Sequence, residues 1–410
     1  KDRVLYFPYM NDGAYMIAAA ARSIGVASEV LPRQTEEEIA IGRKFTSSKE
    51  CFPMICTTGS FIKKLNEPGA DPSKMCFFMP DHNGPCRFGQ YNQFHRILFD
   101  RLGFEKAELI TPSNDTSYQD VAGEHGQKFR LRAWKGFLAA DYIRKIHREI
   151  RPYEINKGET DKLYQDAIHR LESCIEKGSS GLHRVLAEIA GDFVAIPADR
   201  SIRRPVVGII GEIFMRDNAG CNGNISNRLE ELGLEVLVGP FSEWIVYSTH
   251  RFTRDSRWKN DKKGIIKSKI QGIGQELISR MLTRGIRKFT DHEKDVSLHD
   301  MLRLSNRYVS EFYDGDPPIA LGTSVALAER GVSGMAAILP FTCMPGTLVA
   351  SLSDSFRKDH NNIPFINIAY DGQDSVSLDT RLQAFAFQVK EYAKSGQVVK
   401  KTLKTTPAAL

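Results

Sequence analysis

The chain has 410 residues, which is too long for one ordinary hydrophobic core and favours two domains. Hydrophobic residues make up 41% and charged residues 26%, and the formal net charge of +6 is too small to indicate a dedicated nucleic-acid binder. No apolar run approaches the ~18 residues of a membrane span, and seven cysteines are few for a disulfide scaffold. We therefore expect a cytoplasmic globular protein with neither nucleic acid nor a membrane as its partner.

Strand and helix signals alternate over the first 128 residues. We expect strands at 3–10, 27–31, 76–79 and 107–111, and helices at 14–25, 54–65 and 91–102. Such alternation is typical of a parallel sheet with helices on its faces. The prediction is an N-terminal Rossmann-like, doubly wound domain over residues 1–128. Because the sequence opens without Met on an apolar, strand-like run, we interpret it as a piece of a longer chain.

Helical spacing without strand signals follows and predicts a helical connector at 129–200. A second β/α set then indicates a C-terminal Rossmann-like domain over 201–397. Its expected strands are 206–214, 235–238, 318–321, 334–341 and 364–370, with helices at 225–232 and 380–394 and mostly helical, basic chain at 242–315. Residues 398–410 show little periodicity and are expected to form a loosely ordered tail. The predicted fold class is α/β, with two Rossmann-like domains and a helical connector.

Three cysteines share one local setting although they are far apart in the sequence. The motifs are Cys51-Phe-Pro53, Gly84-Pro-Cys86-Arg-Phe-Gly89 and Phe341-Thr-Cys343-Met-Pro-Gly346, each with a Pro beside the Cys and an expected helix just after it. Ligands of open α/β sheets collect beyond the carboxyl ends of the strands, and a helix N-terminus stabilises a thiolate. We predict that Cys51, Cys86 and Cys343 converge between the domains as ligands of an iron–sulfur cluster. The alternative is that each is a small buried hydrophobe.

The other four cysteines are weaker candidates. Cys76 begins an expected strand and Cys174 lies in an amphipathic helix, so we interpret both as core residues. Cys56 follows Cys51 by five residues, which turns it to another side of the helix. Cys221 lies in a Gly- and Asn-rich loop and ranks fourth. Zinc is disfavoured because the chain has no Cys-x-x-Cys pair.

Several charged residues are candidates for tuning or assisting chemistry. His82 and Arg87 flank Cys86 and are predicted cofactor-binding residues, as donors to cluster sulfur, with surface solvation as the alternative for Arg87. Glu212 and Asp371 each end a strong strand signal, where a general acid or base would lie, although capping of the next turn explains them equally well. The catalytic residues are left unassigned.

Nucleotide hydrolysis is expected elsewhere, because the chain has no Walker A sequence and Gly208-Ile-Ile-Gly211 falls short of the dinucleotide fingerprint. Residues 251–269 hold eight Lys or Arg against two Asp. A solvated helical face is the common explanation of such a run, and a docking site for an activase or for the phosphates of a CoA ester is the alternative.

With these motifs assembled, the chain resembles the D-component family of 2-hydroxyacyl-CoA dehydratases. It is most similar to the dehydratase-like part of the large fused activase proteins of that system, which are related to the 2-hydroxyglutaryl-CoA dehydratase activator. The matching segments beyond Cys51-Phe-Pro53 and Gly84–Gly89 are Val207-Gly-Ile-Ile-Gly-Glu-Ile-Phe-Met-Arg216, Pro240-Phe-Ser-Glu-Trp244, Ala328-Glu-Arg-Gly-Val332, Pro340-Phe-Thr-Cys-Met-Pro-Gly346 and Tyr370-Asp-Gly-Gln373. They run from near residue 50 to about residue 385.

The resemblance implies a [4Fe–4S] cluster, or in some relatives a double-cubane iron–sulfur cluster, with low-potential electrons delivered by an ATP-hydrolysing activase. It also implies a CoA-ester substrate and a dimer. A double cubane needs more cysteine ligands than the three that match, so one cubane is favoured. Whether the chain alone is an enzyme, as a dehydratase-like lyase or an ATP-dependent reductase component, stays open. The alternatives are a metal-free scaffold or regulatory module of a larger activase assembly, and a sugar- or nucleotide-binding α/β protein.

Overall fold

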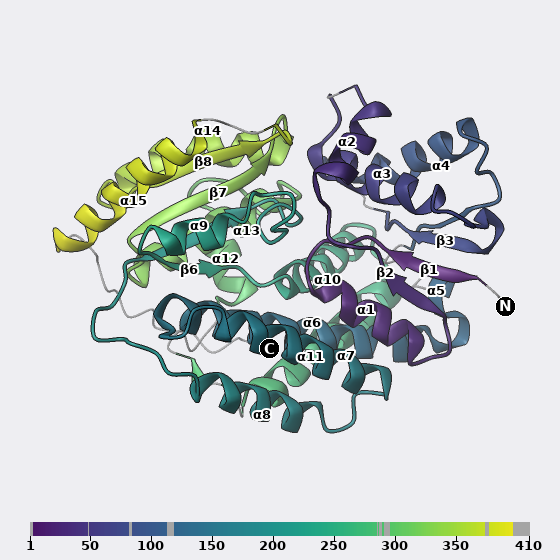
Figure 1. Cartoon of the computed structure of the whole chain (residues 1–410), viewed down its shortest axis with the longest axis horizontal. Coiled ribbons are helices and arrows are strands. Elements are labelled where there is room, and N and C mark those ends of the chain that lie inside the picture. Colours follow the sequence, from purple (N-terminus) through teal and green to yellow (C-terminus); the bar gives the residue numbers. More distant parts are fainter. Residues whose placement is uncertain are drawn as a thin grey trace.

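The computed structural model describes residues 3–47, 49–81, 84–112, 119–284, 286, 289–290, 296–373 and 377–396. It is an α/β fold with two four-stranded parallel sheets flanked by helices, consistent with two Rossmann-like domains (Figure 1). The predicted fold class is therefore confirmed. His82 and the tail at 398–410 lie outside the described residues, and the domain boundaries stay predictions.

The two sheets have the same strand order. The first is β2-β1-β3-β4 and the second is β6-β5-β7-β8, with every neighbouring pair parallel. The strands are β1 Val4–Phe7, β2 Ser28–Val30, β3 Met75–Phe78, β4 Glu108–Ile110, β5 Val206–Gly211, β6 Glu235–Val238, β7 Gly334–Pro340 and β8 Phe365–Tyr370. The inner strands β3 and β7 are buried along their whole length, as expected for strands covered on both faces.

Helices of the predicted connector complete the first sheet. The N-terminal helices are α1 Gly13–Arg22, α2 Glu36–Lys44, α3 Phe52–Leu65, α4 Tyr91–Arg101 and the short α5 Gln119–Ala122. After them come α6 Gly126–Ile150, α7 Glu159–Glu176 and α8 Leu182–Val194, which share one buried core with β1 and α1. The alanines of α1 are fully buried there, because small side chains let the neighbouring helices approach closely. Figure 1 shows α6, α7 and α8 as a layer beside α1.

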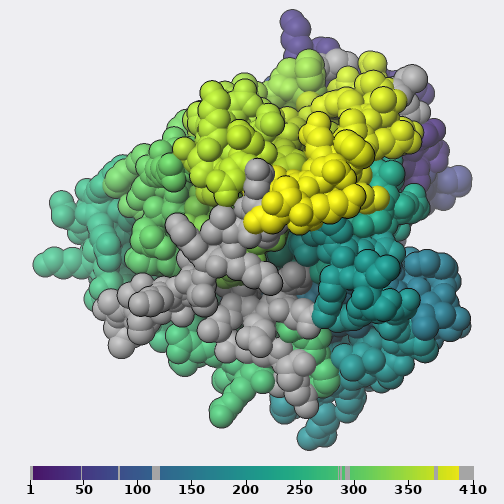
Figure 2. Space-filling model, turned by 90° about the vertical axis from the view of Figure 1, so that its left-hand side faces the viewer, coloured from purple at the N-terminus to yellow at the C-terminus, as the bar shows by residue number. Residues whose placement is uncertain are grey.

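The second sheet is flanked by its own helices. They are α9 Ile225–Glu231, α13 Asp316–Glu329, α14 Met344–Asp359 and α15 Leu378–Lys394, while α10 Ser242–Trp258, α11 Lys262–Thr283 and α12 Leu298–Ser305 lie between β6 and β7 in the sequence. In Figure 2 the green and yellow residues of this domain cover the upper part of the face shown, and the purple N-terminal residues appear only at its rim. None of the helices in the described part combines the length and apolar character that a membrane crossing needs.

Two expectations about local structure differ from the fold. Residues 318–321, expected as a strand, lie inside α13, a helix that is buried on nearly all sides and therefore gives a continuous apolar run that mimics a strand. The pair Pro317-Pro318 in its first turn is a helix-start signal. Helix α2 was not expected, although Thr35 and Glu38 form a capping box that the sequence displays.

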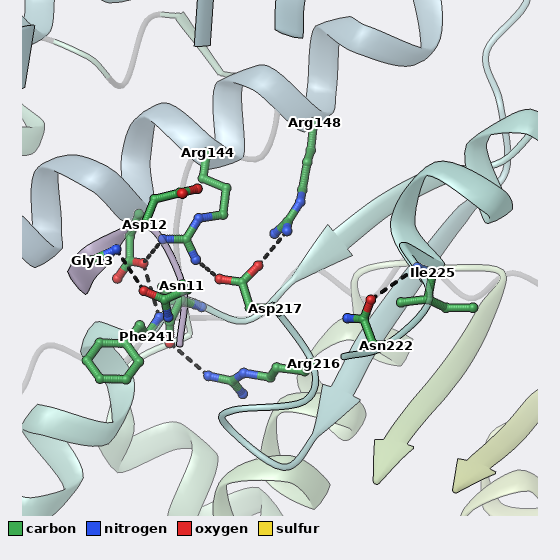
Figure 3. Close-up of polar contacts among 12 residues, drawn as sticks. Asn11, Asp12, Gly13, Arg144, Arg148, Arg216, Asp217, Asn222, Ile225 and Phe241 are labelled. Carbon is green, nitrogen blue, oxygen red and sulfur yellow. Dashed lines mark hydrogen bonds and ion pairs between the residues drawn. The ribbon is translucent and has the colours of Figure 1, made fainter. Parts of the chain in front are cut away.

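Buried polar contacts join the two domains. Asp217, on the loop after β5, accepts from Arg148 of α6 at 2.5 Å and pairs with Arg144 of the same helix (Figure 3). Arg151, one turn further along, forms a two-point ion pair with Glu230 at 2.7 and 2.8 Å. Because breaking a buried pair leaves an uncompensated charge, these contacts hold the second domain against α6.

Helices α2 and α3 approach each other through two glycines. A Cβ on Gly59 would lie 1.7 Å from the carbonyl oxygen of Glu38, and one on Gly42 would lie 2.0 Å from that of Ile55. No larger residue fits at either contact. Helix α3 is therefore fixed closely against α2, which matters because two cysteines belong to α3 and its N-cap.

We expect Gly59→Ala to lower the free energy of unfolding by about 2 to 3 kcal/mol, because the added methyl group forces the two helices apart. Denaturant titration measures the effect. Gly191→Ala in α8 is the matched control, since its Cβ would meet nothing within 4 Å, and it should raise stability by up to ~1 kcal/mol. Equal stability of Gly59→Ala and the wild type would show that this contact is not tight.

His95 of α4 is fully buried and neutral. Its Nε2 lies 3.1 Å from the hydroxyl of Thr58, and burial lowers the pKa of His95 from 6.5 to about 3. A histidine whose pKa is depressed in the folded state stabilises the fold above its unfolded pKa. That stability is lost as the pH falls below about 6.5, because the unfolded chain then binds the proton first.

From this histidine alone we expect the unfolding free energy to fall by about 2 to 3 kcal/mol between pH 7 and pH 4.5. Denaturant titrations at several pH values give the profile, and His95→Gln should flatten it by that amount. His169→Gln, at an exposed position on α7, should leave the profile unchanged. Parallel profiles for the wild type and His95→Gln would contradict the assignment.

Candidate thiol site between the domains

Each of the three predicted cysteines occupies the N-cap position of a helix. Cys51 is the N-cap of α3 and Cys343 the N-cap of α14, both in extended backbone conformation and both followed by Pro in the first turn. Cys86 is the N-cap of the 3₁₀ helix Arg87–Gln90, and its sulfur accepts from the backbone N–H of Phe88 at 3.5 Å. The prolines need no backbone partner in a first turn, so the capping geometry is set locally by the sequence.

The fold brings these three caps together from both domains. The thiols of Cys51 and Cys343 share a hydrogen bond, and Cys86 is close enough to Cys343 for their charges to interact. The hydroxyl of Tyr91, at the start of α4, also bonds to Cys51 and lies near Cys86. Cys343 therefore interacts with both Cys51 and Cys86, and the role of the three as ligands of one cluster stays a prediction.

Two carboxyl groups face the same place. Glu212 follows β5 and caps the next turn by accepting from the N–H groups of Phe214 and Met215 at 3.1 and 2.9 Å. It also interacts electrostatically with Cys86, Cys343 and Tyr91. Burial, and then the charge of Asp316, raise the pKa of Glu212 to about 8. Burial likewise raises the pKa of Asp316 to about 6, while Arg216 opposes the shift. Glu212 can thus hold a proton near neutral pH.

The pKa values of Cys86 and Cys343 are raised in this environment. Burial, and then the nearby acidic groups, raise the pKa of Cys86 to about 12, with the Phe88 N–H acting in the opposite direction. The hydrogen bond with Cys51, and then burial, raise the pKa of Cys343 well above its usual value. Several acidic groups packed together disfavour each other's charge.

Arg87 ties the three cysteine loops together. Its guanidinium donates to the carbonyl oxygen of Lys49 at 2.5 Å, and to the carbonyl and hydroxyl oxygens of Thr342 at 2.6 and 3.0 Å. Lys49 lies two residues before Cys51, and Thr342, held at a left-handed φ of 59°, lies directly before Cys343. One side chain beside Cys86 therefore holds the backbones that lead into the other two.

The remaining candidates fall elsewhere. Asp371 caps its own turn by accepting from Gln373 N–H at 2.8 Å, and its carbonyl oxygen accepts from Arg43. The thiol of Cys76 lies 3.3 Å from Glu108, and that of Cys174 contacts the carbonyl oxygen of Ser180 at 3.6 Å.

The sequence analysis did not identify Tyr91 and Asp316 as part of the site. The Asp-Pro-Pro helix start could have indicated Asp316, whereas nothing local distinguishes Tyr91 from a core aromatic.

Among the residues that the structure describes, no three or more His, Cys, Asp or Glu side chains are grouped so as to hold one metal ion. Ligands of a single ion must converge on one point at about 2.3 Å, whereas cysteines of a cubane each bind a different iron.

No protein-family model matches the sequence, and no curated protein matches it either.

We expect Arg87→Met to raise the rate at which iodoacetamide alkylates Cys51 and Cys343 in metal-free protein by about 10- to 100-fold. The variant loses hydrogen bonds from a charged donor that are worth about 1.5 to 3 kcal/mol, so the loops open more often. Peptide mass spectrometry after timed labelling measures the rates. Arg101→Met, at the exposed end of α4, removes the same charge without this clamp and should leave them unchanged. Unaltered labelling in Arg87→Met would refute the clamp.

Proposed function

We propose that this chain is the iron–sulfur component of a cytoplasmic, ATP-dependent system for low-potential electron transfer. It receives electrons from an ATP-hydrolysing activase, in the manner of a dehydratase or reductase component. The observation that supports this most is the meeting of Cys51, Cys86 and Cys343 at three helix N-termini, from positions spread over most of the chain and from both domains.

The residues present fit a [4Fe–4S] cluster. Cys51, Cys86 and Cys343 would each hold one iron, which leaves one iron free for solvent, substrate or another ligand. When bound, such a cluster supplies one-electron transfer. The backbone N–H groups of Phe88 and Gly346 act to lower the pKa of Cys86 and Cys343, but burial and neighbouring acidic groups outweigh them, so binding would require the cluster to displace the thiol protons.

Neighbouring side chains have their own parts in this proposal. The Tyr91 hydroxyl shares a hydrogen bond with Cys51, and a hydrogen bond to ligand sulfur raises the potential of a cluster. Arg87, predicted as a donor to cluster sulfur, instead contributes by holding the backbones of two ligand loops. Glu212, whose pKa is raised to about 8 by burial and then by Asp316, would give or take a proton near the cysteines.

A single cubane is favoured over the double-cubane alternative by the positions of the other cysteines. Cys76 bonds to Glu108 and Cys174 to Ser180, both away from the thiol site. Cys56 and Cys221 are in contact with each other. Three thiols are therefore left to act as ligands, and a double cubane needs more.

The basic segment at 251–269 is the proposed docking surface for the activase or for a CoA ester. Two of its arginines are used internally, since Arg251 and Arg254 pair with Asp314 at 2.9 and 2.8 Å. Its lysines are exposed at the start of α11 and suit an anionic partner. The substrate itself is not specified by any contact in this region.

We expect the anaerobically purified or reconstituted chain to hold about four irons and equal sulfide, and Cys86→Ala to lose nearly all of both. Iron and sulfide analysis with absorption spectroscopy measures this. Cys174→Ala, which removes a thiol remote from the site, should keep the full content. Undiminished iron in Cys86→Ala would remove Cys86 from the ligand set, and a wild-type chain that takes up no iron would favour the metal-free scaffold instead.

A further inference from the structure

A second pair of thiols lies at the domain interface. The sulfur atoms of Cys56 and Cys221 are 3.2 Å apart although the residues are 165 positions apart in sequence. Cys56 belongs to α3 of the first domain, and Cys221 to the loop between β5 and α9 of the second. Both are buried, with exposed fractions of 0% and 4%. Neither is one of the three capping cysteines.

The backbone fixes the position of each sulfur. On the first side, Gly42 and Gly59 pack α3 tightly against α2, as described above. On the second side, a Cβ on Gly220 would lie 2.2 Å from the carbonyl oxygen of Gln34, so this loop rests directly on the first domain. The amide of Asn218 also donates to the side chain of Gln34 at 2.9 Å. The two backbones that carry the thiols therefore stay close together through the domain contact.

We propose that Cys56 and Cys221 form a reversible disulfide that joins the two domains covalently. A disulfide bond is about 2.05 Å long, so the sulfurs need to approach by only about 1 Å. The oxidant is a low-molecular-weight disulfide such as oxidised glutathione. One protein thiolate attacks it and releases one thiol, and the second protein thiolate then attacks the mixed disulfide and releases another. Two protein thiols and one small disulfide thus give one protein disulfide and two small thiols, which carry away the two protons.

The rate of this disulfide formation depends on how often the two domains separate. With both sulfurs buried, a small disulfide reaches them only when the interface separates. Burial, and then the hydrogen bond with Cys221, raise the pKa of Cys56, which also keeps the closed form unreactive. Once formed, the disulfide prevents this separation. It would also fix Cys51, on the N-cap of the same helix, relative to Cys343 of the other domain.

The test uses the full chain, purified without oxygen and incubated with oxidised glutathione. Free thiols are then blocked with N-ethylmaleimide, and the protein is digested without reductant for mass spectrometry. We expect one linked pair of peptides, containing Cys56 and Cys221 and lacking two hydrogens, which dithiothreitol separates. The partly exposed Cys174 provides the internal control, because its conversion to a mixed disulfide proves that the oxidant was active.

Two variants and a second measurement complete the test. Cys221→Ser and Cys56→Ser should each give no link between the domains, whereas Cys174→Ser should give it in full. Amide hydrogen exchange in the peptide that contains residues 215–224 should slow by about tenfold or more in the oxidised wild type and stay unchanged in Cys221→Ser. If a variant fails to fold, the peptide map of the wild-type protein still shows whether Cys56 and Cys221 become linked.

The proposal is overturned if Cys174 is fully converted and no Cys56–Cys221 link forms, or if Cys56 links to Cys51 instead. It is also overturned if the link forms without slowing exchange, because the disulfide would then not hold the domains together. Iron content is not a readout, so these outcomes are independent of the proposed electron-transfer function.

Discussion

The loop between β5 and α9 is the contact on which the geometry of the thiol site depends. Asp217 is held by two arginines of α6, Asn218 and Gly220 rest on Gln34, and Cys221 touches Cys56. Glu212, at the start of this loop, faces the capping cysteines. Two rigid sheets can adopt many relative orientations, and buried polar contacts select one because each misplacement would leave a charge or an amide without its partner.

Charge is balanced differently at the two thiol groups. Cys51, Cys86 and Cys343 combine helix N-termini, which favour negative charge, with two carboxyl groups, which oppose it. The pair of Cys56 and Cys221 is dominated by burial and mutual contact, with weaker charge effects from Cys51 and Glu212. The first arrangement suits a positively charged ligand that removes the thiol protons, and the second suits chemistry between the two sulfurs themselves.

Local signals in the sequence were sufficient for most of the fold and for the cysteine caps. Alternating apolar strands and helices predicted two parallel sheets, and the Cys-Pro turns before helices identified Cys51, Cys86 and Cys343. The strand predicted at 318–321 was wrong, because a helix that is buried on nearly all sides loses the apolar periodicity that marks a helix. The contacts of Arg87 with Thr342 and of Cys56 with Cys221 join residues 255 and 165 positions apart, and no local sequence pattern predicts which distant residues meet. The helical spacing predicted that Cys56 and Cys51 lie on different sides of the helix, but it could not show that Cys221 packs against Cys56.

The order in which the capping cysteines occur along the chain has a consequence for biosynthesis. Cys51 and Cys86 emerge from the ribosome with the first domain, and Cys343 follows roughly 250 residues later, which takes about 10 to 50 seconds at ordinary rates of translation. During that interval the first domain has no loop from the second to cover its thiols, and the Arg87 side chain has no Thr342 to bind. The thiol site is thus among the last parts of the molecule to form, and the cell must protect two exposed cysteines until synthesis of the second sheet is complete.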